Sequence, residues 1–229
     1  MKLLSRGVTL VELLVATAIA LLLCAAVTTL FANNIQTNQM QRALAEVNES
    51  VQFTSGFMKH EFEMAGFPNA ELIPQPIDWS RSFDDKLFDQ VAVRRQPAPN
   101  DYNCIGSEFD TSTQIYITVF KIKSNTLYCQ IFDSTGKEVL NPQALIVGIE
   151  GFQITYGVEV LSDVDRSKIG TVFIPARDID STHHRVVAVR IHLALQSTQQ
   201  DNAAHIVHRT VEWTLPLKNV PKIIGVMTV

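Results

Sequence analysis

The first 65 residues carry two successive patterns of apolar and polar positions, and together they predict one long helix. Residues 13–32 form an uncharged, almost wholly apolar run. About 20 helical residues at 1.5 Å each span roughly 30 Å, the thickness of the hydrocarbon core of a bilayer. Polar residues dominate 33–41, and the apolar residues then recur on one helical face at Met40, Leu44, Val47, Val51, Met58 and Phe62.

Nothing in the sequence interrupts this helix before its end. No Pro or Gly occurs between Val8 and Ser55, whereas Gly66 and Pro68 are typical of a helix terminus. We therefore expect a helix from about residue 8 to about residue 65, with 8–32 in the membrane and 33–66 as an amphipathic half. The amphipathic half could form a coiled-coil stalk, but its heptad pattern is short and imperfect. Packing on the chain's own C-terminal domain, residues 67–229, is the preferred interpretation.

Strand patterns dominate the chain after Asp101. Alternating β-branched and aromatic residues, with turn residues between them, predict an antiparallel hairpin around Ser124-Asn125 and further strands. One long helix followed by five to seven strands is an α+β order, with the sheet expected on the amphipathic half of the helix. The expected strands are 88–94, 114–120, 126–132, 144–149, 151–160, 186–195 and 206–215.

Charge and cysteine content narrow the surroundings of the chain. The 229 residues carry a net charge of −4 and no basic block, so a nucleic-acid partner is not predicted. Lys2 and Arg6 precede the apolar run and the next basic residue is Arg42, which predicts a cytoplasmic N-terminus and an exported remainder. In an oxidising compartment Cys104 and Cys129 are expected to form a disulfide worth about 3 kcal/mol; two buried thiols are the alternative. The third cysteine, Cys24, lies in the apolar run.

No catalytic, cofactor or metal site is predicted. The acidic residues Asp163, Asp165, Asp178 and Asp180 do not fit a calcium loop, because Lys168 stands where the turn glycine belongs. His183 and His184 have no third ligand at a suitable spacing. The sequence also lacks a nucleophile elbow and a phosphate-binding loop, so we expect a protein without enzymatic activity.

The N-terminal residues Gly7-Val8-Thr9-Leu10-Val11-Glu12, with the apolar run behind them, resemble the class III signal of type IV pilins and pseudopilins. In that family a prepilin peptidase cuts after the glycine on the cytoplasmic side and methylates the new terminal amine. The resemblance implies a leader peptide of residues 1–7, cleavage between Gly7 and Val8, and N-methylation of Val8, where the family usually has Phe. An ordinary cleavable signal peptide and a plain single-span anchor are the alternatives.

Glu12 is then the fifth mature residue, the position at which the family carries its glutamate. A carboxylate in a membrane-spanning segment costs several kcal/mol unless it is paired. The amine created by cleavage, on a neighbouring subunit, would provide that partner during assembly. The alternative is that Glu12 reaches the lipid headgroups from the start of the helix.

Three later segments are similar to the PilW type of minor pilin. They are M-A-G-F at 64–67, I-E-G-F-Q-I-T-Y-G-V-E at 149–159 and V-V-A-V-R-I-H-L at 186–193. The resemblance implies a type IV pilin-like fold and a role in starting or priming a type IV pilus. The implied partners are other minor and major pilins, the prepilin peptidase, the inner-membrane assembly platform and membrane lipid. The implied location is the inner membrane, followed by the pilus at the cell surface.

Two rival interpretations remain at this point. A J-type pseudopilin of type II secretion shares the same architecture. A membrane-anchored periplasmic enzyme or binding protein would make the glycine at position 7 irrelevant. The apolar tail, residues 221–229, has no assigned role: an edge strand or a partner contact would each fit it.

Overall fold

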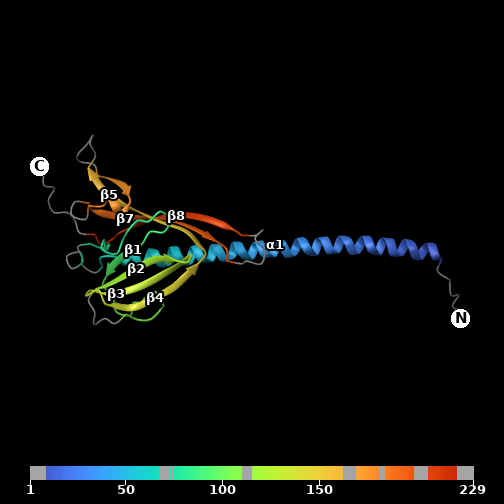
Figure 1. The fold of residues 1–229 in the computed structure, drawn as a ribbon, viewed down its shortest axis with the longest axis horizontal. Helices are drawn as coiled ribbons and strands as arrows, with labels where there is room; N and C mark the ends of the chain where they lie inside the picture. The colour runs from blue at the N-terminus through green and yellow to red at the C-terminus, as the bar shows by residue number, and fades with distance from the viewer. Residues whose placement is uncertain are drawn as a thin grey trace.

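A computed structural model describes residues 9–67, 73, 75–109, 115–161, 169–180, 184–198 and 206–220. One long helix extends from a β-rich domain, and the N-terminal half of the helix lies outside that domain (Figure 1). The strands form two four-stranded sheets. The predicted α+β order is confirmed.

The helix α1 runs from Leu10 to Met64 and is followed by the strands of the domain. The first sheet has the order β1-β2-β3-β4 and the second the order β6-β5-β7-β8, with antiparallel pairing throughout. A short 3₁₀ helix, η1 (Ala176–Asp178), follows β6. The strands are β1 (Val91–Arg95), β2 (Tyr116–Lys123), β3 (Thr126–Asp133), β4 (Glu138–Val147), β5 (Ile149–Leu161), β6 (Ile169–Ile174), β7 (Val186–Gln196) and β8 (His208–Pro216).

The core lies where the C-terminal half of α1 meets both sheets. Phe62 and Met58 of the helix are fully buried in one apolar cluster with Phe120 of β2 and Phe152 of β5. The rings of Phe62 and Phe120 stack at 6.5 Å between centroids. Alternation along β7 buries Val189, Ile191, Leu193 and Leu195, as a strand with one face toward the core requires. The expectation that the helix packs on its own domain is confirmed.

Two glycines make the joints of this domain. Gly148 connects β4 of the first sheet to β5 of the second at a φ of +85°, and a Cβ there would lie 2.3 Å from the Gln196 carbonyl oxygen. Gly66 follows the helix at a φ of +79°, and a Cβ there would lie 2.4 Å from the Asn219 carbonyl oxygen. Both positions therefore need glycine for conformation and for space.

The strand predictions differ from the structure at two edge strands, β6 and β4. No strand was expected at β6, a short edge strand that pairs with β5 alone among the described strands. The prediction at 144–149 was too short, because β4 begins at Glu138 and includes Pro142. Proline removes a ladder donor and reads as a turn, but an edge strand tolerates it.

The predicted apolar stripe of the helix is wrong at its N-terminal end. Met40 and Leu44 are 51% and 42% exposed, whereas Ala43 and Val47 face the core. Farther along the helix, Thr54, Met58, Glu61 and Phe62 are buried. The buried face thus starts about one turn later and contains a carboxylate, which a purely hydrophobic stripe does not predict.

Candidate assembly site

The N-terminal half of α1 is apolar and uncovered. The chain has one helix long and apolar enough to cross a membrane among the described residues, and none of its most apolar segment is buried by the rest of the protein. Leu10 is 75% exposed and Leu22 is 72% exposed. The thiol of Cys24 is exposed on this half as well. A surface of this kind needs lipid or the helices of other proteins around it.

A capping box closes the start of this helix. Thr9 is the N-cap, and its hydroxyl accepts the Glu12 N–H at 3.2 Å. The Glu12 carboxylate accepts the Thr9 N–H at 3.0 Å and the Thr9 hydroxyl at 3.1 Å. The Glu12 carboxylate therefore satisfies the N–H of the N-cap residue and lies at the positive end of the helix dipole. Gly7 and Val8 lie outside the described residues, so the predicted cleavage site stays a prediction.

The second half of α1 is fastened to the domain by a buried ion pair that the sequence did not reveal. Arg95, at the end of β1, donates from Nε and Nη2 to the two carboxylate oxygens of Glu61 at 3.2 and 2.9 Å. Its Nη1 donates to Asp101, and its guanidinium lies 4.7 Å from the ring centroid of Phe109. The side chains of Arg95 and Glu61 are 0% and 1% exposed. Glu61 and Arg95 stand 34 positions apart, so no local pattern could pair them.

Two opposing effects act on the charge state of Arg95. Burial alone lowers the pKa of Arg95, but the charges and hydrogen bonds of Glu61 and Asp101 outweigh burial and raise the pKa above its ordinary value. The guanidinium is therefore held in its charged form. A bidentate pair between a helix and a strand fixes the position of one relative to the other.

The disulfide between Cys104 and Cys129 is present in the structure. Cys129 lies in the middle of β3 and is fully buried, and Cys104 lies in the loop after β1. The bond spans 25 positions and ties that loop to the first sheet. The same loop carries Asp101 and Phe109, so the disulfide also holds the groups around Arg95.

The residues considered for metal binding do not assemble into a site where they can be placed. Among the described ranges, no group of three His, Cys, Asp or Glu side chains is arranged to hold a metal ion. His184 Nδ1 accepts the backbone N–H of Asp180 at 3.0 Å, which makes it part of a loop turn. Asp178 ends the short helix η1. Asp163, Asp165 and His183 lie outside the described residues.

Comparison with solved structures places the fold. A type IV-like pilin from Thermus thermophilus matches with a TM-score of 0.51 and 10% sequence identity, covering 77% of this chain and 98% of that chain. The family model for type IV pilus-assembly protein W matches residues 113–222, a range that includes β2 to β8. The chain therefore has a pilin-like fold, and its residues 113–222 are similar to the PilW family. A comparison with curated proteins finds no match to the sequence.

The PilW match confirms the resemblance drawn from the later segments, since two of them, 149–159 and 186–193, lie inside the matched range.

The capping box at Thr9 and Glu12 was not predicted, although its spacing is visible in the sequence. Thr9 and Glu12 stand three positions apart directly before an apolar run, which is the pattern of a capping box.

Proposed function

We propose that this protein is a minor pilin of the PilW type that takes part in starting or priming a type IV pilus. It is stored in the inner membrane by the N-terminal half of α1, with its domain on the periplasmic side, and joins other pilins by packing of that half. The observation that supports this best is the division of one helix into an uncovered apolar half and a buried half. The proposed role is structural and involves no catalytic step.

The proposed assembly contact at Glu12 involves more than an unpaired charge. In the isolated subunit the carboxylate already bonds Thr9, so its cost in lipid is smaller than that of a bare charge. The Glu12 carboxylate is nevertheless exposed and acceptor-rich, with room for a cationic partner. Under this proposal the N-terminal amine of a neighbouring subunit adds a charge-assisted contact to the existing cap.

Cleavage at the glycine is tested by processing of the membrane protein. The full chain is expressed with a prepilin peptidase, extracted from the membrane, and its N-terminus is determined by sequencing and mass spectrometry. The expected N-terminus is methylated Val8, and Gly7→Ala is expected to leave the precursor at its full length and to reduce piliation. A mature chain that starts at Met1 or beyond Ala32 would overturn the pilin assignment.

The contact at Glu12 is tested with two variants that separate charge from capping. Glu12→Gln removes the charge but keeps a side chain that completes a capping box, whereas Thr9→Val keeps the charge and removes the cap hydroxyl. Glu12→Gln is expected to lose co-purification with partner pilins about tenfold, because the charged contact is gone. Thr9→Val is expected to stay within about threefold of the unmodified protein. Both variants are expected to insert into the membrane normally.

The reverse ranking of these two variants would contradict charge pairing and assign Glu12 a capping role alone. The same co-purification addresses the rival assignment to type II secretion. Recovery of pseudopilins in place of type IV pilins would favour the J-type interpretation.

A further inference from the structure

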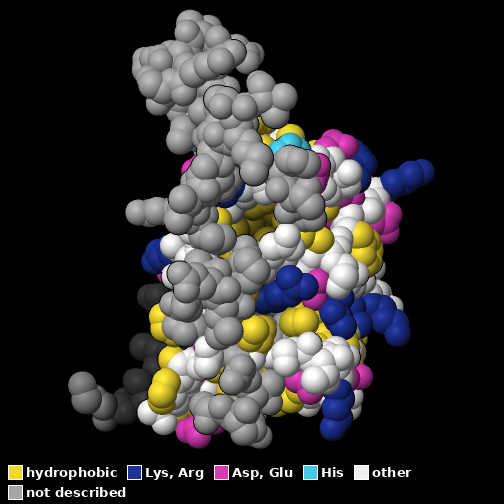
Figure 2. Space-filling model, turned by 90° about the vertical axis from the view of Figure 1, so that its left-hand side faces the viewer, with side chains coloured by type: hydrophobic (Ala, Val, Ile, Leu, Met, Phe, Trp, Pro, Cys, Tyr) yellow, Lys and Arg dark blue, Asp and Glu magenta, His cyan; other side chains and the backbone are white. Residues whose placement is uncertain are grey.

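A hollow of about 370 Å³ opens at the end of the domain opposite the apolar half of α1. Its place follows from Arg94, which lines it and whose carbonyl oxygen accepts the N–H of Gly66 just after the helix ends. Figure 2 views the molecule from this end and shows Lys and Arg side chains standing among hydrophobic ones. The hollow therefore lies on the surface that points away from the membrane-spanning half.

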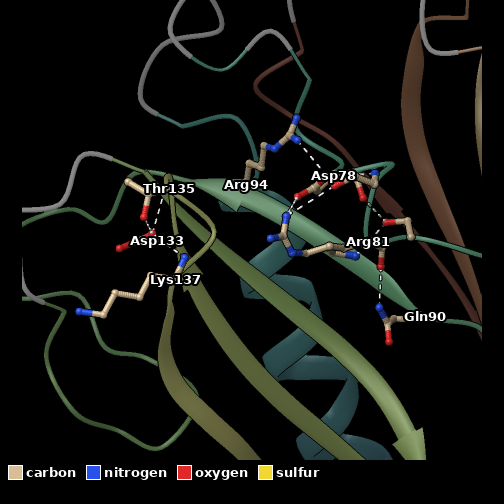
Figure 3. Close-up of polar contacts among 10 residues, drawn as sticks. Asp78, Arg81, Gln90, Arg94, Asp133, Thr135 and Lys137 are labelled. Carbon is tan, nitrogen blue, oxygen red and sulfur yellow. Dashed lines mark hydrogen bonds and ion pairs between the residues drawn. The ribbon is translucent and has the colours of Figure 1, made fainter.

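Two arginines share one buried carboxylate in this hollow. Asp78 is fully buried, and its carboxylate accepts Arg81 Nη1 at 3.0 Å and Arg94 Nη2 at 2.8 Å. It also accepts the N–H of Ser80 at 3.1 Å and the Ser80 hydroxyl at 2.6 Å. Figure 3 shows both guanidinium groups converging on Asp78 beside the β3–β4 turn. Four donors on two oxygens leave Asp78 little capacity for further bonds.

The arginines, in contrast, have capacity left. A guanidinium has five N–H donors, and each of these two gives one short bond to Asp78. The side chains of Arg81 and Arg94 are 29% and 30% exposed, so their remaining N–H donors are accessible from the hollow. The guanidinium of Arg81 also lies 4.8 Å from the ring centroid of Phe132, which fixes its orientation. Two arginines and one aspartate leave one net positive charge on the lining.

The rest of the lining suits a compact organic body. Ile115 is partly exposed and supplies apolar surface, while Ile73 and Ile117 are 1% and 5% exposed and lie beneath it. The exposed turn residues Ser134 and Thr135 supply polar groups. Ligand sites in proteins are concave, have volumes of a few hundred Å³ and contain a small number of fixed polar groups. The hollow has this size and carries two fixed guanidinium groups.

We propose that this hollow binds a small carboxylate of about the size of a monosaccharide acid. The carboxylate is held by the remaining donors of Arg81 and Arg94, and the body of the ligand rests on Ile115 and on the turn residues Ser134 and Thr135. A carboxylate fits better than a phosphate, because one negative charge balances the single excess positive charge, whereas a phosphate monoester carries about −1.5 to −2. Asp133 opposes a second charge, since its carboxylate lies in the adjoining turn, bonded by the N–H groups of Thr135 and Lys137. This assignment does not depend on the proposed role in pilus assembly.

The test is isothermal titration calorimetry on the full chain in detergent, with glucuronate as the probe. Glucose, which has the same ring without the acid, and inorganic phosphate are the comparison ligands. We expect glucuronate to bind at a Kd of ~1 mM or tighter, at least tenfold more tightly than glucose or phosphate. Equal binding of glucose, no binding of glucuronate, or a preference for phosphate would each overturn the proposal.

Variants locate the binding. Ser134→Asp puts a negative charge on an exposed turn residue of the lining and is expected to weaken glucuronate about tenfold without loss of fold. Gln52→Glu adds the same charge on the exposed face of α1 and is expected to change nothing. Arg81→Gln is expected to weaken binding as much as Ser134→Asp.

Arg190→Gln is the matched control for Arg81→Gln. Arg190 also makes an ion pair, with Glu212 at 3.4 Å, and lies over an aromatic ring, that of Phe173, but it belongs to the second sheet. Unchanged binding is expected in this control. If Ser134→Asp leaves glucuronate binding intact, the acid binds elsewhere and the assignment of the hollow is wrong. Tighter binding of an acidic peptide than of the sugar acid would likewise overturn the ligand class.

Discussion

The two halves of α1 share one continuous backbone and have opposite surroundings. Residues 10–38 have exposed side chains throughout, although this stretch contains the most apolar part of the chain. Residues 43–62 are less apolar, yet they place Val47, Met58 and Phe62 in the core. The difference shows that hydrophobicity alone does not decide which surface a domain covers: the first half is left for lipid or other helices, and the second half stabilises the domain. Three experiments test this division, and a fourth tests an ion-pair cluster elsewhere in the domain.

The largest contrast is expected between Phe62→Ala and Leu22→Ala. Truncating the buried phenyl ring removes its contacts with Phe120 and leaves a cavity, at a cost of about 3–5 kcal/mol in the free energy of unfolding. The exposed leucine should cost the domain nothing. Denaturant unfolding of the full chain in detergent, followed by tryptophan fluorescence, measures both. A similar loss in the two variants would mean that the halves do not differ as described.

The second-largest loss in the free energy of unfolding is expected when Arg95 is removed. Arg95→Met leaves Glu61 buried without its partner, which costs roughly 3–5 kcal/mol. The double variant with Glu61→Leu should recover most of that loss, because an apolar pair needs no desolvation of charge. The same unfolding measurement checks both proteins. If the double variant is as unstable as the single one, the pair fastens α1 by shape and not by charge.

Removal of the disulfide is expected to have a somewhat smaller effect. Replacing both Cys104 and Cys129 by serine should lower the free energy of unfolding by about 3 kcal/mol, because the unfolded chain loses a cross-link. Cys24→Ser is the control on the uncovered half and should leave domain stability unchanged. Reduction of the unmodified protein with a thiol reagent should reproduce the loss, and a loss in Cys24→Ser would contradict the division.

The smallest effect is expected from protonation of Asp78. Burial alone raises the pKa of this carboxyl, but hydrogen bonds from Ser80 and Arg81 and the charge of Arg94 outweigh burial and hold the pKa below the ordinary value of 3.8. A lowered pKa in the folded state gives stability that is present above pH 3.8 and is lost as the pH falls below it. The stability difference between the unmodified protein and Asp78→Asn should therefore shrink below that pH, as pH-dependent unfolding would measure. A constant difference would contradict the ion pairs at Asp78.

Much of the fold could be predicted from the sequence because it rests on local patterns. The helix ends at Met64, before the expected Gly66, and β7 alternates as its β-branched residues predict. The hairpin turn lies at Ser124 and Asn125, both with positive φ. The disulfide followed from the compartment and the cysteine count. These features need only neighbouring residues or simple chemistry.

The rest depends on contacts between distant positions. Glu61 places a carboxylate on the buried face of α1. This burial is possible because Arg95, from β1, pairs with the carboxylate. Asp78 can be buried as a charged group because the fold brings Arg94 within bonding distance of it. The candidate assembly site was predicted through Glu12 by family resemblance, whereas its bond to Thr9 was readable from spacing and was missed.

The unbroken course of α1 has a mechanical consequence. A pulling force applied to the uncovered half travels along a single hydrogen-bonded rod, with no proline in Leu10–Met64 to give way first. That load first enters the domain at Ala43 and Val47, where the buried half of the helix begins. It reaches the Glu61–Arg95 ion pair near the end of the helix, beside the loop that the disulfide ties to β3. Tension on the helix is thus shared by the apolar contacts of its buried half and by one buried ion pair near its end.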